Sequence, residues 1–154
     1  MNLNFFDGLF LVIAISLNIL VIAIFIVRKK GFEQLEHNIG YIVISCAIPL
    51  FMIMLNYILI GKELWIIIYI IIIISFLMIE MILDYILKIA FRTNLKIAVP
   101  YVLIYYVAYW GLLAISFVIN LIAGFIVFGL FVLNLISTIY AHKSDKKDHV
   151  KSSN

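Results

Sequence analysis

The chain has 154 residues, of which 67% are hydrophobic and only 12% are charged, and its formal net charge is +3. A soluble domain of this length cannot bury so much apolar surface, so the composition excludes an ordinary soluble protein and indicates a lipid environment. The basic residues flank apolar runs instead of forming a patch of their own, which argues against a nucleic-acid partner.

The first half of the chain contains three apolar runs that are long enough to cross a bilayer. A span needs about 20 residues, because an α-helix rises about 1.5 Å per residue across about 30 Å of hydrocarbon. The predicted spans are residues 5–27, 41–60 and 64–87. These runs are too long and too uniformly apolar for barrel strands, so we expect an all-α helix bundle. The polar segment 28–40 is expected to be a loop.

The apolar stretch 99–140 is too long for one span and barely long enough for two. Asn120 best fits a turn within it, which predicts spans over residues 99–119 and 121–140. The five spans together form a single transmembrane domain over residues 1–141. The polar segment 142–154 is expected to be a solvated, mobile tail.

The distribution of basic residues predicts the orientation of the bundle. With five spans, the N-terminus lies outside and the C-terminus lies in the cytoplasm, and every basic residue except Lys62 falls on the cytoplasmic side. Four spans would separate the basic tail from the basic loops, so the positive-inside rule favours five. The loops are minimal and no targeting peptide is visible, which predicts a multi-pass protein of a prokaryotic cytoplasmic membrane.

Two carboxylates lie near the end of the third span, in the stretch LMIEMILDYILKIAFR. Glu80, Asp84, Lys88 and Arg92 recur every four residues, which places them on one slowly drifting face of an α-helix. If the helix leaves the hydrocarbon near Leu87, Asp84 lies about 5 Å inside and Glu80 about 10 Å inside. Asp84 therefore reaches the headgroups, whereas Glu80 does not.

Glu80 is the strongest candidate for a functional residue. An ionised carboxylate at its depth costs several kcal/mol unless it is paired, hydrated or protonated, so it should face other helices or a cavity. No basic residue of another span is expected at its level. On the fourth span, Tyr105 and then Tyr109 are the predicted hydrogen-bond partners, and His37, just before the second helix, is expected to meet Asp84. Glu80, Asp84, Tyr105, Tyr109 and His37 are the predicted substrate- or ion-binding residues.

Other polar residues within the spans fit packing roles. Asn18 and Asn134 are typical of residues that hydrogen-bond between helices. Asp84 also suits an interfacial ion pair on its own helix. Pro49 frees a backbone carbonyl in the second span and predicts a kink beside Cys46.

The sequence leaves three classes of function open. No cysteine cluster, Gly-rich phosphate loop or Ser-His-Asp set is visible, so we expect no metal or cofactor and consider an enzyme the less favoured class. The first hypothesis is an accessory, regulatory or immunity-type interaction protein, with a membrane protein or a second copy as partner. The second is a small carrier or channel in which Glu80 and Asp84 bind a proton or cation. The third is a lipid-processing enzyme at the inner interface.

Overall fold

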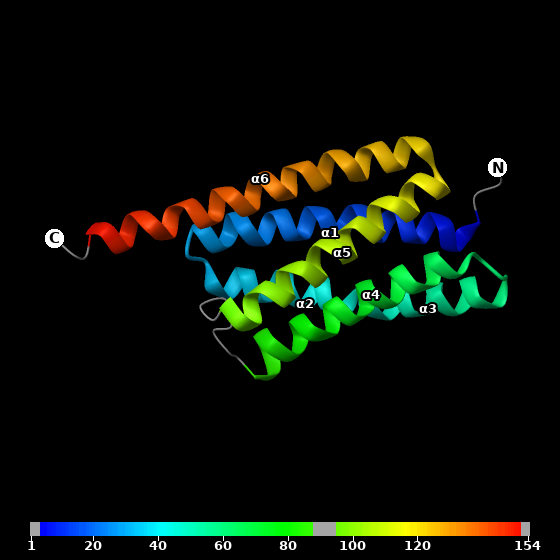
Figure 1. Ribbon diagram of the computed structural model, residues 1–154, viewed down its shortest axis with the longest axis horizontal. Helices are drawn as coiled ribbons and strands as arrows, with labels where there is room; N and C mark the ends of the chain where they lie inside the picture. The colour runs from blue at the N-terminus through cyan, green and yellow to red at the C-terminus, as the bar shows by residue number, and fades with distance from the viewer. Residues whose placement is uncertain (1–3, 88–94, 152–154) are drawn as a thin grey trace.

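The computed structural model describes residues 4–87 and 95–151, and within these ranges every regular element is a helix. The order is α1 (Phe5–Lys29), α2 (Glu33–Ser45), α3 (Ala47–Leu59), α4 (Leu64–Glu80), the π-helix η1 (Met81–Ile86), α5 (Leu95–Ile119) and α6 (Leu121–Lys151) (Figure 1). Lys88 and Arg92, two members of the predicted polar face, lie outside the described residues.

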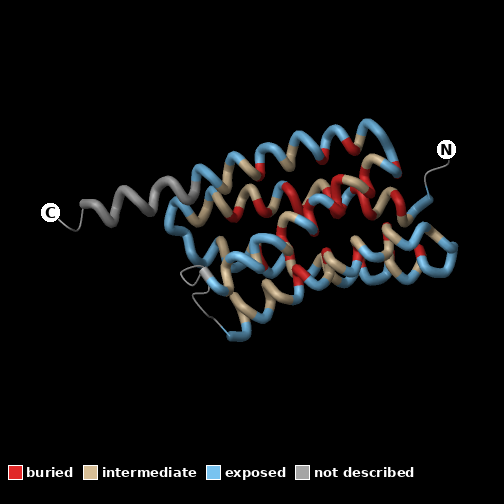
Figure 2. Tube along the Cα trace, viewed as in Figure 1, coloured by how far each residue is buried: buried red, intermediate tan, exposed pale blue. Residues whose placement is uncertain are grey.

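Five of these helical segments are long and apolar enough to cross a membrane. They are Phe5–Lys29, Glu33–Leu59, Leu64–Ile86, Lys96–Ile119 and Leu121–Tyr140. This confirms the predicted all-α architecture with five candidate spans. Many large apolar side chains remain on the outside, and α6 is exposed along much of its length (Figure 2). Such a surface suits contact with lipid, since contiguous exposed apolar surface is rare on soluble monomers.

The bundle has two ends, which we name for the turns and the basic residues that lie there. One end, which we call the turn end, holds the start of α1, the α3–α4 turn at Gly61 and the α5–α6 turn at Asn120 (Figure 1). The other, the basic end, holds the α1–α2 turn at Gly31 and the start of α5. Gly31 and Gly61 have φ of 75° and 68°, a conformation that favours glycine and allows both tight turns.

The second helical segment begins earlier than the predicted span. α2 starts at Glu33, within the segment expected to be a loop, so the placement of His37 before the helix was wrong. Two acidic residues, Glu33 and Glu36, occupy the first turn, where the positive end of the helix dipole favours them. Arg28 Nε also donates a hydrogen bond of 2.7 Å to Glu36 Oε1, which fixes the first turn against α1.

The predicted interruption beside Cys46 is confirmed. α2 ends at Ser45 and α3 begins at Ala47, with Cys46 between them. Pro49 has no N–H to donate to the Ser45 carbonyl, and its ring crowds that oxygen, so the regular ladder cannot continue there.

The α5–α6 turn lies at Asn120, as predicted. α5 ends at Ile119 and α6 begins at Leu121. The Asn120 side chain accepts a hydrogen bond of 3.0 Å from the Ala123 N–H, which caps the start of α6. α6 then continues to Lys151, so the helix extends into the segment that the sequence predicted to be a solvated tail. No glycine or proline follows Gly129 in α6 to end it sooner.

Helix α1 lies at the centre of the bundle and packs against α2, α3, α5 and α6. Its buried side chains recur every three or four residues along its whole length, which is the spacing of one helix face. α5 crosses the bundle obliquely: it meets α6 at Asn120 and reaches α4 at the basic end (Figure 1). This oblique path determines where the bundle is tightly packed and where it is open.

A close approach of α4 and α5 gives a test of the packing. A Cβ added at Gly111 would lie 2.6 Å from Tyr69 Cδ1 and 3.0 Å from Tyr69 Cβ. Because Tyr69 Cβ cannot move without its backbone, Gly111→Ala should lower the free energy of unfolding by about 1–3 kcal/mol. Gly129→Ala is the matched control, since nothing lies within 4 Å of its added Cβ. Unfolding in detergent micelles measures both, and equal stabilities would contradict the helix contact.

Candidate ligand- or ion-binding site

Two adjoining cavities lie near the basic end of the bundle. The first, the polar cavity, has a volume of about 210 Å³, and the second, the apolar cavity, about 130 Å³. Ile24, Arg28 and Glu80 line both of them. Glu80 therefore lies where the two cavities meet, and the expectation that it faces the helices agrees with its half-buried position.

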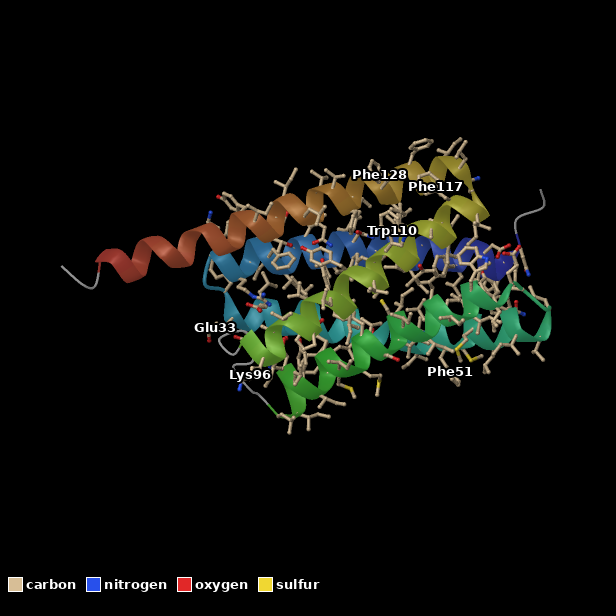
Figure 3. The ribbon with its side chains drawn as sticks, viewed as in Figure 1. Glu33, Phe51, Lys96, Trp110, Phe117 and Phe128 are labelled. Carbon is tan, nitrogen blue, oxygen red and sulfur yellow. The ribbon has the colours of Figure 1, made fainter. Side chains whose placement is uncertain are left out.

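The polar cavity brings together three of the five predicted site residues. Its wall holds four carboxylates, one guanidinium and one imidazole, contributed by Glu33, Glu36, Glu80, Asp84, Arg28 and His37. Figure 3 shows Glu33 and Lys96 at this same end of the bundle. Glu80, Asp84 and His37 thus line one cavity. Their role as substrate- or ion-binding residues stays a prediction.

The apolar cavity lies between α1, α5 and α6. Besides the three shared residues, its wall consists of Val21, Phe25, Ala98, Tyr101, Val102, Tyr105, Tyr106 and Thr138. Tyr105 is the fourth predicted residue that reaches a cavity. The fifth, Tyr109, lies deeper in the bundle, is 3% exposed, and donates a weak hydrogen bond of 3.5 Å to the Leu17 carbonyl.

Tyr101, not Tyr105, donates the hydrogen bond to Glu80. Its hydroxyl lies 2.9 Å from Glu80 Oε2. The prediction measured depth from Val99, which placed Tyr105 about 9 Å along the helix at 1.5 Å per residue. α5 instead begins at Leu95, so the same rise ends at Tyr101. The error therefore came from the start of the helix, not from the choice of helix or residue type.

The aromatic rings of α5 form a continuous group beside Glu80. The ring centroids of Tyr101, Tyr105 and Tyr109 lie 5.6, 5.5 and 6.5 Å from that of Phe76 on α4. Their spacing of four residues puts all three on one face of α5. Tyr105 and Tyr109, predicted as ligands, thus pack in this group, where their rings support the wall that carries Tyr101.

Arg28 is a site residue that sequence reasoning missed. We expected no basic residue of another span near Glu80, yet Arg28 lines both cavities with it. Glu36 holds the guanidinium, with Nη2 at 2.5 Å and Nε at 2.7 Å from Oε1, and the Phe25 ring lies 5.7 Å from it. Its position in the sequence could have predicted this. Ile24, four residues earlier, lies on the buried face of α1, and residues four apart share a face of an α-helix.

The π-helix η1 carries Asp84 and departs from the regular α-helix that was expected. A π-helix closes hydrogen bonds from i to i+5, so a turn contains more residues than in an α-helix. Four residues beyond Glu80, Asp84 therefore falls short of a full turn instead of passing it. Both carboxylates still line the polar cavity.

Tyr85 on η1 contacts α2, and the sequence did not indicate this contact. Its hydroxyl donates a hydrogen bond of 3.1 Å to the His37 carbonyl, and its ring stacks on the imidazole with centroids 4.5 Å apart. A Cβ added at Gly40 would lie 1.8 Å from the Tyr85 hydroxyl. Gly40 therefore leaves the space that lets Tyr85 position His37 at the polar cavity.

Two buried asparagines do not fill the role predicted for them. Asn18 Nδ2 donates a hydrogen bond of 2.9 Å to the Ala14 carbonyl of its own helix, not to another helix. Asn134 is 1% exposed and lies beside Tyr105. Among the described residues, neither polar atom of Asn134 and not the Oδ1 of Asn18 has a hydrogen-bond partner. Buried water is the usual partner for such atoms.

A second polar cluster, at the turn end, was also missed. The Asp7 carboxylate is 8% exposed; Asp7 Oδ1 accepts a hydrogen bond of 2.7 Å from the Tyr57 hydroxyl and lies 3.3 Å from Lys62 Nζ. These contacts tie α1 to α3 and to the following turn. The available signal was an acidic residue in an otherwise apolar first turn, together with Lys62 as the one basic residue predicted at that end.

No known protein family, curated protein or solved structure matches the chain. Within residues 4–87 and 95–151, no three His, Cys, Asp or Glu side chains are grouped so that they could hold a metal ion.

The Asp7 cluster gives a second stability test. Asp7→Ala leaves the Tyr57 hydroxyl and the Lys62 ammonium without their acceptor, so the free energy of unfolding should fall by about 2–3 kcal/mol. Glu63→Ala is the control, because Glu63 is an exposed residue at the same end, and within the described residues its carboxylate accepts a hydrogen bond only from the partly buried Trp65. Denaturant unfolding in micelles measures the difference, and two equal losses would mean that the buried cluster contributes nothing.

Proposed function

We propose that the chain is a small carrier of a prokaryotic cytoplasmic membrane that binds a proton or a cation at Glu80 from the cytoplasm. The observation that carries this proposal is the position of Glu80 at the meeting point of the two cavities. A membrane-embedded carboxylate that lines a cavity instead of facing lipid is the usual mark of a proton or ion site.

The charges at the two ends support the proposed orientation. Arg28, Lys29, Lys30 and Lys96 lie at the basic end, whereas Lys62 lies at the turn end and is paired with Asp7. The positive-inside rule then puts the basic end in the cytoplasm, with the N-terminus outside and the C-terminus inside. In this orientation the polar cavity faces the cytoplasm.

The packing of the two halves supports a carrier in preference to an open channel. The half toward the turn end is filled by side chains with almost no exposed surface: Phe10, Leu50, Ile53, Ile70, Ile73, Leu112 and Ile115. The cavities lie in the other half. An open channel needs a continuous passage, whereas a carrier in an inward-facing state has this combination of an accessible site and a closed outer half.

The electrostatics of the polar cavity favour a cation over an anion. Four of its described side chains carry carboxylates, and the guanidinium of Arg28 is already bound by Glu36. The Tyr101 hydroxyl holds one oxygen of Glu80 and fixes the direction of the carboxylate. A cation would meet a positioned carboxylate without first displacing a salt bridge at Arg28. The interaction-protein and lipid-enzyme hypotheses stay predictions, and a stoichiometric membrane partner on copurification would favour the former.

Labelling of single cysteines tests the orientation. In a Cys46→Ser background, a cysteine at residue 2 should react with a membrane-impermeant maleimide added to intact cells. A cysteine at residue 150 should react only after the cells are opened. Labelling of both positions in intact cells, or of neither, would exclude an odd number of spans in this orientation.

Transport by the purified protein tests the role of Glu80. In vesicles with an imposed sodium or potassium gradient, we expect proton movement that an enclosed pH dye detects. Glu80→Gln keeps the shape and removes the charge, so it should reduce the rate at least tenfold, because the exchangeable group is lost. Glu63→Gln, at the other end, is the matched control and should transport normally. Full activity in Glu80→Gln would refute the proposed carrier site.

A further inference from the structure

The apolar cavity has a size and a wall that the binding of a proton or a metal cation does not require. Its volume of about 130 Å³ is close to that of cavities of about 150 Å³ that bind benzene. Phe25, Tyr101, Tyr105 and Tyr106 supply its aromatic wall. A metal cation does not need an apolar space of this size, so the cavity indicates a ligand with an apolar group.

The wall of the same cavity also contains a charged group. Glu80 lies in its wall, with its carboxylate held by Tyr101 at 2.9 Å. A neutral lipid acyl chain makes no favourable interaction with a carboxylate, and burying a carboxylate against such a chain is costly. A ligand that uses both features carries a positive charge next to an apolar group of limited size.

We infer that the ligand of this site is an organic ammonium ion with one apolar group about the size of a benzene ring. Its ammonium lies at Glu80, where the two cavities meet, and its apolar group lies in the apolar cavity. This inference rests on the proposed function, because it assigns a substrate class to the same carboxylate. Aromatic rings near an ammonium add cation–π attraction, which suits the tyrosine wall.

Arg28 does not oppose this assignment, although it lines both cavities. Its guanidinium is bound to Glu36 by Nε and Nη2 and lies over the Phe25 ring. The positive charge is therefore neutralised by the Glu36 carboxylate.

The path of α5 gives the ligand a way in from the side of the bundle. α5 and α6 meet at Asn120 and diverge toward the basic end (Figure 1). The apolar cavity lies in this divergence, between Val102 on α5 and Thr138 on α6, and Val102 is 43% exposed. An amphipathic cation that is dissolved in the membrane reaches the cavity there without passing through the polar cavity.

Three probes separate charge from apolar group: benzyltrimethylammonium, tetramethylammonium and benzyl alcohol. Calorimetric titration of the purified full chain in lipid nanodiscs gives the three affinities. We expect benzyltrimethylammonium to bind at least tenfold more tightly than either of the others, since it alone uses both features. Its permanent charge removes any contribution from protonation of the ligand.

Four variants locate the bound groups. Glu80→Gln should abolish the binding of benzyltrimethylammonium. Val102→Trp fills the apolar cavity from α5 and should reduce the ratio of the benzyl to the tetramethyl affinity toward one. Thr138→Leu fills the same cavity from α6, and the ratio of the two affinities can be measured in this variant if Val102→Trp misfolds. Val118→Trp is the matched control, since Val118 is an exposed valine, at 50%, on the same helix near the turn end.

The outcomes distinguish this inference from the proposed function. If all cations bind in a Glu80-dependent way but with equal affinity, the ligand class is wrong and the carrier proposal stands. If the benzyl preference survives both cavity-filling variants, the apolar group does not lie in this cavity and the inference is refuted. If no cation binds and Glu80→Gln transports normally, both proposals fail.

Discussion

The buried face of α1 is the feature on which the other helices depend. It runs through the centre of the bundle as an apolar stripe with a charged residue near each end. Asp7 binds Tyr57 and Lys62 at the turn end, and Arg28 binds Glu36 at the basic end. Apolar packing fixes which face is inside but allows sliding along the axis, whereas these polar contacts set the register of α1 against its neighbours. Charged groups at such positions are stable only with partners, so the two ends are constrained together.

The oblique path of α5 divides the bundle into a tight half and an open half. Near the turn end, Gly111 lets α5 approach the Tyr69 ring closely, and the surrounding side chains leave almost no exposed surface. Toward the basic end the same helix moves away from α6, and the space between them becomes the apolar cavity. A single crossing angle therefore produces both the closed half and the site. The π-helix η1 and Gly40 then complete the polar cavity, because they let Tyr85 bring η1 against α2.

Glu80 connects these structural features to the proposed chemistry. Its carboxylate is half-buried, accepts a hydrogen bond from a tyrosine hydroxyl, and borders the polar cavity on one side and the apolar cavity on the other. A carboxylate between two such environments changes its interaction energy strongly when a proton or cation binds, because apolar surroundings screen its charge poorly. The proposals for cation binding and for an amphipathic ammonium ligand both follow from this position. They differ only in whether the apolar cavity is used.

The sequence by itself determined the number of candidate spans, the turn at Asn120, the interruption beside Cys46 and the half-buried carboxylate at Glu80. Each of these depends on local properties: the length of an apolar run, a capping side chain, a missing N–H, or a charge within hydrocarbon-like sequence. Only the tertiary structure decided that Tyr101 binds Glu80, that Arg28 shares its cavities and that Asp7 pairs with Lys62. These contacts depend on where each helix starts and at what angle it crosses its neighbours. A shift of one helical turn, about 5.4 Å, exchanges one tyrosine for the next, and no local pattern in the sequence records that shift.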